Sequence, residues 1–70
     1  MDLTQFAALI GDAEQNAPDV QPVLNELEQA IAALMDAIHI EKDQQRKMAM
    51  VALKYRARLV RERWKKQGVN

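Results

Sequence analysis

Apolar residues recur with helical spacing in three separate stretches of the 70-residue chain. The first stretch has apolar residues at i, i+3, i+4 and i+7, which lie together on one face of a helix. These residues are Leu3, Phe6, Ala7 and Ile10. Gly11 weakens this helix and the pattern fades by Gln15. The sequence therefore predicts a short first helix over about residues 3–14.

The second stretch follows a short linker, residues 16–19, in which Pro18 disfavours helical dihedral angles at the preceding residue. Asp19 is then a candidate N-cap. The apolar seam of this second stretch steps alternately by three and four positions over two heptads. Met35 and nearby valines and alanines widen the seam. The seam residues are Leu24, Leu27, Ile31, Leu34 and Ile38. We expect a second helix over about residues 20–39.

The third stretch carries a seam of the same kind in a different phase. Its members are Met50, Leu53, Ala57, Val60 and Trp64. Four further apolar residues are expected to widen this seam: Met48, Ala49, Ala52 and Leu59. Asp43 can cap the start of this helix, and Gly68 is suited to a left-handed cap just beyond its end. The predicted third helix covers about residues 44–66.

The connection between the second and third stretches has two interpretations, because residues 39–46 contain no Gly or Pro. The chain either turns near residues 40–44 or continues as one helix about 70 Å long. We favour the turn, since the second seam fails at Glu41 and Gln45 and a hairpin lets both seams face one core. The expected fold is all-α: a short N-terminal helix followed by an antiparallel helical hairpin, in a single domain.

A chain of this size is expected to need additional buried surface. About 60% of the surface of the unfolded chain is buried in so small a domain. Cys is absent and His39 is the only His, so neither a disulfide nor a metal site is expected, and no cofactor motif is present. We therefore expect a homodimer whose helical bundle is built from the two seams.

Charge is segregated along the chain although the net charge is zero. Residues 1–41 carry eight acidic and no basic residues, a net charge of −8, whereas residues 42–70 carry ten basic and two acidic residues, a net charge of +8. The simplest interpretation is charge pairing between the acidic second helix and the basic third helix. Each exposed pair contributes about 0–1 kcal/mol, so such pairs set orientation more than stability.

A basic stripe runs along one side of the predicted third helix. It consists of Lys47, Lys54, Arg58, Arg61 and Lys65. Such a stripe can bind phosphates or an acidic surface of another protein. The neutral net charge, the acidic second helix and the absence of a phosphate-binding loop weigh against nucleic acid, which is the alternative interpretation.

Enzymatic and membrane roles find little support in the sequence. Ser and Cys are absent, so Thr4 and Tyr55 carry the only side-chain hydroxyls. No apolar run approaches the roughly 18 residues of a membrane span, and the N-terminus lacks a basic leader. We expect a non-enzymatic, soluble protein of the cytoplasm.

The predicted function is that of a small regulator or adaptor that binds another protein and modulates it, inhibition included. Tyr, Trp and Arg are enriched at the residues that dominate binding energy in protein interfaces. The candidate contact residues are Tyr55, Arg58, Arg61 and Trp64 of the third helix, with Phe6 and Ile10 of the first. Trp64 also falls on the seam, so the sequence allows either a core or an interface position for it.

Overall fold

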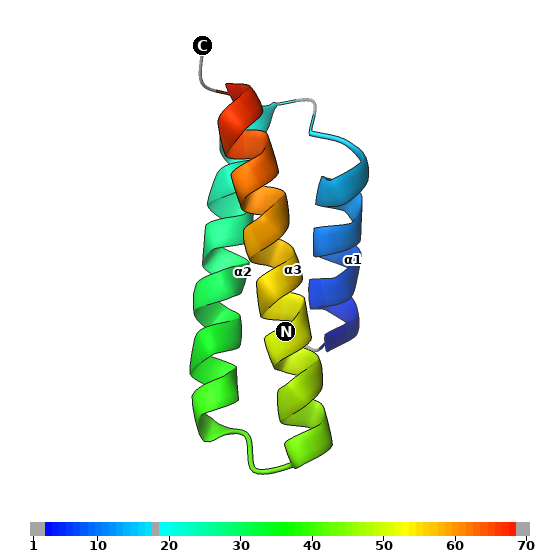
Figure 1. The fold of residues 1–70 in the computed structure, drawn as a ribbon, viewed down its shortest axis with the longest axis vertical. Helices are drawn as coiled ribbons and strands as arrows, with labels where there is room; N and C mark the ends of the chain where they lie inside the picture. Colours follow the sequence, from blue (N-terminus) through cyan, green and yellow to red (C-terminus); the bar gives the residue numbers. More distant parts are fainter. Residues whose placement is uncertain (1–2, 18, 69–70) are drawn as a thin grey trace.

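A tight turn between the second and third helices determines the architecture. The computed structural model describes residues 3–17 and 19–68. The described residues form three helices, α1 (Leu3–Gln15), α2 (Val20–Ile40) and α3 (Gln44–Gly68). Figure 1 shows α2 and α3 antiparallel and side by side, with α1 packed alongside. The predicted all-α fold with a helical hairpin is confirmed, and the single long helix is ruled out.

The hairpin turn is built from side-chain acceptors rather than from Gly or Pro. After Ile40, the last residue of α2, Glu41 takes an extended conformation with φ −74° and ψ 129°. Oε2 of Glu41 accepts hydrogen bonds from the backbone N–H groups of Lys42 and Asp43, at 3.1 and 3.2 Å. These donors are thereby satisfied where the helical hydrogen bonds stop.

The start of α3 is capped by Asp43, as predicted. Its Oδ1 accepts hydrogen bonds from the backbone N–H groups of Gln45 and Arg46, at 3.0 and 3.4 Å. Nε of Arg46 lies 2.9 Å from Oε1 of Glu41, which ties the turn to the first turn of α3. The helix break is thus encoded by two acidic side chains at the ends of the turn.

The other helix ends differ in part from the expectations. Asp19 precedes α2 in an extended conformation, but its side chain makes no capping hydrogen bond. Gly68 is the last residue of α3 rather than a left-handed cap beyond it, and no Gly in the described part of the chain has a positive φ. Pro18 of the linker lies outside the described residues.

The hydrophobic core lies between the three helices and uses both predicted seams. Its fully buried large side chains are Ile10, Leu27 and Leu34. The buried apolar residues together are Phe6, Ile10, Ala13, Leu27, Ala30, Ile31, Leu34, Met50, Ala57 and Val60. The remaining seam residues, Leu24, Ile38, Leu53 and Trp64, are half-buried. The residues predicted for a dimer or a core therefore pack within one chain.

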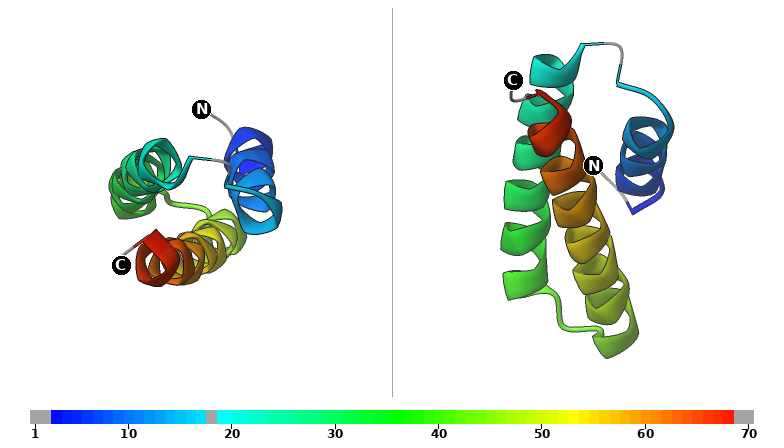
Figure 2. Two further views of the ribbon diagram at one scale, coloured as in Figure 1. Left: turned by 90° about the horizontal axis from the view of Figure 1, so that it is seen from above. Right: turned by 45° about the horizontal axis from the view of Figure 1, so that its top comes forward.

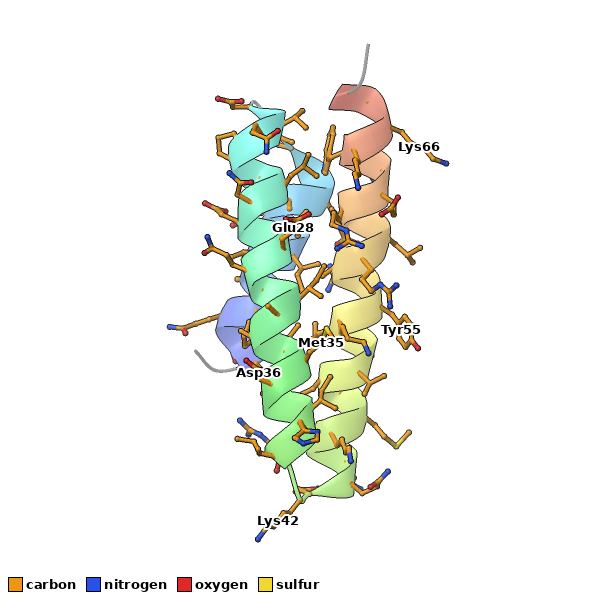
Figure 3. All side chains as sticks on the ribbon, turned by 90° about the vertical axis from the view of Figure 1, so that its left-hand side faces the viewer. Glu28, Met35, Asp36, Lys42, Tyr55 and Lys66 are labelled. Atoms are coloured by element: carbon orange, nitrogen blue, oxygen red, sulfur yellow. The ribbon has the colours of Figure 1, made fainter. Side chains whose placement is uncertain are left out.

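The first helix covers one side of the hairpin. It packs mainly against α3 and only slightly against α2. The view from above in Figure 2 shows the three helices at the corners of a triangle, and Figure 3 shows the face of the hairpin with α1 behind it. The side of the hairpin opposite α1 is consequently left open.

Candidate protein-binding surface on the third helix

An apolar stripe is exposed on the side of α3 that points away from the core. The stripe consists of Met48, Ala52, Tyr55 and Leu59, which follow one another by four, three and four positions. Met48, Tyr55 and Leu59 are 64%, 55% and 74% exposed. At about 100° per residue, this stripe lies on the opposite side of the helix from the buried seam. The third helix is therefore apolar on two opposite faces.

The prediction that Met48, Ala49, Ala52 and Leu59 widen the core seam is wrong, because all four are exposed. The reason is the number of neighbouring helices. Among the helices of residues 3–17 and 19–68, α3 contacts α2 and α1, and both lie toward its buried face. Met35 of α2, also predicted to widen a seam, is 55% exposed for a similar reason.

Tyr55 is the aromatic centre of the apolar stripe. Figure 3 shows Tyr55 projecting from the edge of α3 that faces away from α2, the same edge from which Lys66 projects. Nζ of Lys54 lies 5.0 Å from the centroid of the Tyr55 ring. Tyr55, Arg58, Leu59 and Glu62 line a shallow depression on this surface. An aromatic ring, an aliphatic side chain and a guanidinium group thus lie together on an open surface.

The basic stripe borders the apolar stripe on one side of α3. In the part of the chain that the structure describes, Lys47, Lys54, Arg58 and Lys65 form no ion pair. The acidic residues within α2 are Glu26, Glu28 and Asp36, and none of them pairs with a cation of α3 in these residues. The expected pairing between the acidic second helix and the basic third helix is therefore not observed.

Arg61 is the member of the basic stripe that forms an ion pair within the described residues. Its side chain is 24% exposed, and its Nη2 lies 3.5 Å from Oε1 of Glu62. Its Nε is buried and has no hydrogen-bond partner. This arrangement leaves one buried donor of the guanidinium group without an acceptor.

On the opposite border of the apolar stripe, the cations are tied to α1. Arg56 donates hydrogen bonds from Nε and Nη2 to Oε1 of Glu14, the former at 2.9 Å. Arg63 donates to the backbone carbonyl oxygen of the same residue. The Arg56 hydrogen bond holds the pKa of Glu14 below its ordinary value of 4.5, and the pKa of Arg56 is correspondingly raised. The two borders therefore differ: one carries unpaired cations and the other carries engaged ones.

Trp64 lies at the junction of α3 and α1. Its Nε1 donates a hydrogen bond of 2.6 Å to the carbonyl oxygen of Ala13. Its ring packs against the core cluster that contains Ile10 and Val60, and Cζ of Arg63 lies 4.7 Å from the ring centroid. Of the two positions that the sequence allowed for Trp64, the structure shows the one packed against the core.

The predicted contact residues of the first helix are also in the core. Phe6 is 4% exposed and Ile10 is completely buried. They are removed from the candidate surface because they pack against the hairpin of the same chain. Of the residues predicted from the sequence, the structure brings Tyr55 and Arg58 together on the open surface, and Arg61 is linked to this surface through its ion pair with Glu62.

It was not predicted from the sequence that Met48 and Leu59 are exposed and belong to a candidate binding surface. The sequence does contain a signal for them, since 48, 52, 55 and 59 repeat the spacing of a seam in their own phase. A helix with two apolar seams can turn only one of them toward a single hairpin partner. The second seam is then available to another molecule.

Two further hollows lie between helices, one bordered by Leu24, Glu28 and Lys65 and the other by Phe6, Leu9 and Glu26. Within residues 3–17 and 19–68, no three His, Cys, Asp or Glu side chains are grouped as a metal site requires. None of the helices described has the length and apolar character needed to cross a bilayer.

Comparisons of this chain with protein-family models, with curated proteins and with solved structures found no match.

Proposed function

We propose that this protein is a non-catalytic regulator or adaptor that binds another protein through the outward face of α3. The observation that carries the proposal is the exposed apolar stripe on a helix whose opposite face already fills the core. Contiguous apolar surface next to charged residues is typical of protein interaction sites. Folding of the single chain leaves Met48, Tyr55 and Leu59 in solvent, so a partner can bury them.

The composition of the surface supports protein binding. Tyr and Arg are over-represented among residues that dominate interface energies, and Leu59 supplies aliphatic area beside Tyr55. The proposed contact residues are Met48, Tyr55, Arg58, Leu59 and Arg61. Compared with the prediction from sequence, Met48 and Leu59 replace the buried Phe6 and Ile10 and the core-packed Trp64.

Nucleic-acid binding remains the alternative function, and one specific observation favours it. Four cations of the basic stripe, Lys47, Lys54, Arg58 and Lys65, form no ion pair among the residues described. Unpaired cations along a helix can contact successive phosphates. The two functions differ in the part of the surface on which they depend: the apolar stripe for a protein partner, the basic stripe for nucleic acid.

The test of the proposed function compares two exposed aliphatic residues of equal accessibility. Leu59 is 74% exposed on the apolar stripe, and Ile40 is 76% exposed at the end of α2, away from the stripe. The tagged protein and its Leu59→Gln and Ile40→Gln variants are used to capture partners from the native lysate, after nuclease treatment, and the captured proteins are identified by mass spectrometry. We expect Leu59→Gln to lose the partner and Ile40→Gln to retain it.

Direct binding to labelled duplex DNA and single-stranded RNA tests the alternative. Arg58 and Lys65 are exposed, so the double variant Arg58→Glu/Lys65→Glu alters the basic stripe without disturbing the core. Strong, salt-dependent binding of nucleic acid that this variant abolishes, together with unchanged binding by Leu59→Gln, would replace the proposed function by the alternative. Capture of the same protein by wild type and Leu59→Gln would refute the proposed contact surface.

A further inference from the structure

We infer that the partner segment that binds α3 is an amphipathic helix with an acidic border along one side of its apolar face. This inference rests on the proposed function and adds the chemistry of the partner. It is carried by the spacing of the apolar stripe and by the difference between the two borders of that stripe.

The spacing of the apolar stripe fits a helix. Met48, Ala52, Tyr55 and Leu59 are separated by four, three and four positions, the alternation with which one helix packs against another. The stripe is about 17 Å long, since it spans eleven residue steps at 1.5 Å each. Its next two positions, Glu62 and Lys66, are polar and exposed. A partner helix of about three turns therefore covers the apolar part of the stripe.

The charges determine the side on which the partner helix is acidic. The border formed by the basic stripe carries Lys54 beside the Tyr55 ring and Arg58 beside Leu59, and neither forms an ion pair among the residues described. On the other border, Arg56 and Arg63 already donate hydrogen bonds to Glu14. Carboxylates on the partner helix consequently gain most along the border of the basic stripe, where Lys54 and Arg58 form no ion pair among the residues described.

A second copy of this chain fits the same surface poorly. Two α3 helices packed antiparallel through their apolar stripes would bring the unpaired cations of both basic stripes close together. A parallel pair would set each basic stripe against the border of the other copy that carries Arg56 and Arg63. Like charges disfavour both contacts. The α2 helix is acidic, but Met35 and Ile40 are its only large apolar residues described as exposed. They are five positions apart and do not continue one seam. Charge and apolar spacing together favour a different protein.

Three synthetic peptides of about 18 residues test the inference against the full-length protein by fluorescence anisotropy. The first has Leu at seam positions and Glu along one border, the second has Lys in place of each Glu, and the third is the acidic peptide with a central Pro. We expect the acidic peptide to bind, the Lys peptide to bind at least about tenfold more weakly, and the Pro peptide to lose binding because its helix is broken.

Variants of the protein locate the peptide on α3. Leu59→Gln should weaken binding of the acidic peptide by about tenfold or more, and the equally exposed control Ile40→Gln should leave it unchanged. Arg58→Glu/Lys65→Glu should reverse the preference, so that the Lys peptide binds more tightly than the acidic one. Circular dichroism of each variant verifies that the helices are intact.

Three results would overturn the inference: equal binding of the acidic and Lys peptides, retained binding of the Pro peptide, or self-association that Leu59→Gln abolishes in sedimentation velocity. The last result would identify a second copy as the occupant. A captured partner that is lost with Leu59→Gln, but whose cross-linked segment is not an acidic helix, would refute the inference and leave the proposed function standing. Retention of every partner by Leu59→Gln would refute the proposed function itself.

Discussion

Truncation of two leucines with opposite environments tests the assignment of buried and exposed faces. Leu34 of α2 is completely buried beside Phe6, Ala30 and Met50, whereas Leu59 of α3 is 74% exposed. Leu34→Ala and Leu59→Ala remove the same atoms. Any difference between their effects on stability therefore reports the surroundings of each side chain.

The expected cost of Leu34→Ala is about 3 kcal/mol in the free energy of unfolding. Buried Leu→Ala changes cost about 2–5 kcal/mol through lost transfer energy and the remaining cavity. The flexible thioether of Met50 can fill part of that cavity, which places the value in the lower half of the range. A 70-residue domain has about 4–10 kcal/mol of total stability, so the variant loses a large fraction of it.

The expected cost of Leu59→Ala is below about 0.5 kcal/mol. About a quarter of the side chain is covered, which corresponds to roughly 0.5 kcal/mol of burial. The slightly higher helix propensity of Ala offsets part of this loss. In thermal unfolding, the midpoint should fall by about 12–24 °C for Leu34→Ala and by less than about 4 °C for Leu59→Ala.

Urea unfolding measured by circular dichroism gives both free energies. Fluorescence of Trp64, the only Trp in the chain, gives a second signal for testing two-state behaviour. Each variant is measured at two protein concentrations. A cost above about 2 kcal/mol for Leu59→Ala would refute the exposed position of the apolar stripe, and a concentration-dependent cost would show that self-association buries it.

Three further substitutions test local features of the fold. Gly11→Ala should stabilise the protein by about 0.5–1 kcal/mol, because the new Cβ would lie 3.7 Å from the nearest Arg56 atom and a helical Gly is entropically costly; urea unfolding measures this gain, and a loss would contradict the packing described. Asp43→Ala should cost about 1 kcal/mol through loss of the cap on α3, with exposed Asp36→Ala as the nearly neutral control in the same assay. Glu14→Gln should lower stability at pH 7, and the difference from wild type should disappear in acid. Since the pKa of Glu14 is lowered by folding, its contribution is complete above the unfolded value of 4.5 and is lost as the pH falls through the folded value. Unfolding free energies measured between pH 7 and pH 2 verify this, and a difference that persists at pH 2 would show that charge is not its cause.

The core seams could be predicted because they depend on local geometry. Leu27, Ile31 and Leu34 on α2 and Met50, Ala57 and Val60 on α3 are buried where helical spacing placed them. The helix break was also predictable, since the seam fails at Glu41 and Asp43 is a good N-cap. The sequence did not predict that the Glu41 side chain accepts hydrogen bonds from two backbone N–H groups of the turn. These hydrogen bonds depend on the extended conformation of the chain after α2.

The ion pair between helices was not predicted from the charge pattern of the sequence. The expectation paired the basic helix with the acidic helix next to it in the hairpin, but the described ion pair between helices joins Arg56 of α3 to Glu14 of α1. Exposed ion pairs contribute too little energy to choose a packing arrangement. The burial of Phe6 and Ile10 brings α1 against α3, and the Glu14–Arg56 pair forms as a consequence.

The sequence by itself determined three helices, the positions of their seams and the place of the turn, because each of these follows from residue spacing and capping over a few turns. Only the tertiary structure decided which apolar residues remain in solvent. A helix with two apolar faces can bury as many of them as it has neighbouring helices to cover them. In this chain α1 and α2 both lie toward the buried face of α3, so Met48, Tyr55 and Leu59 stay exposed.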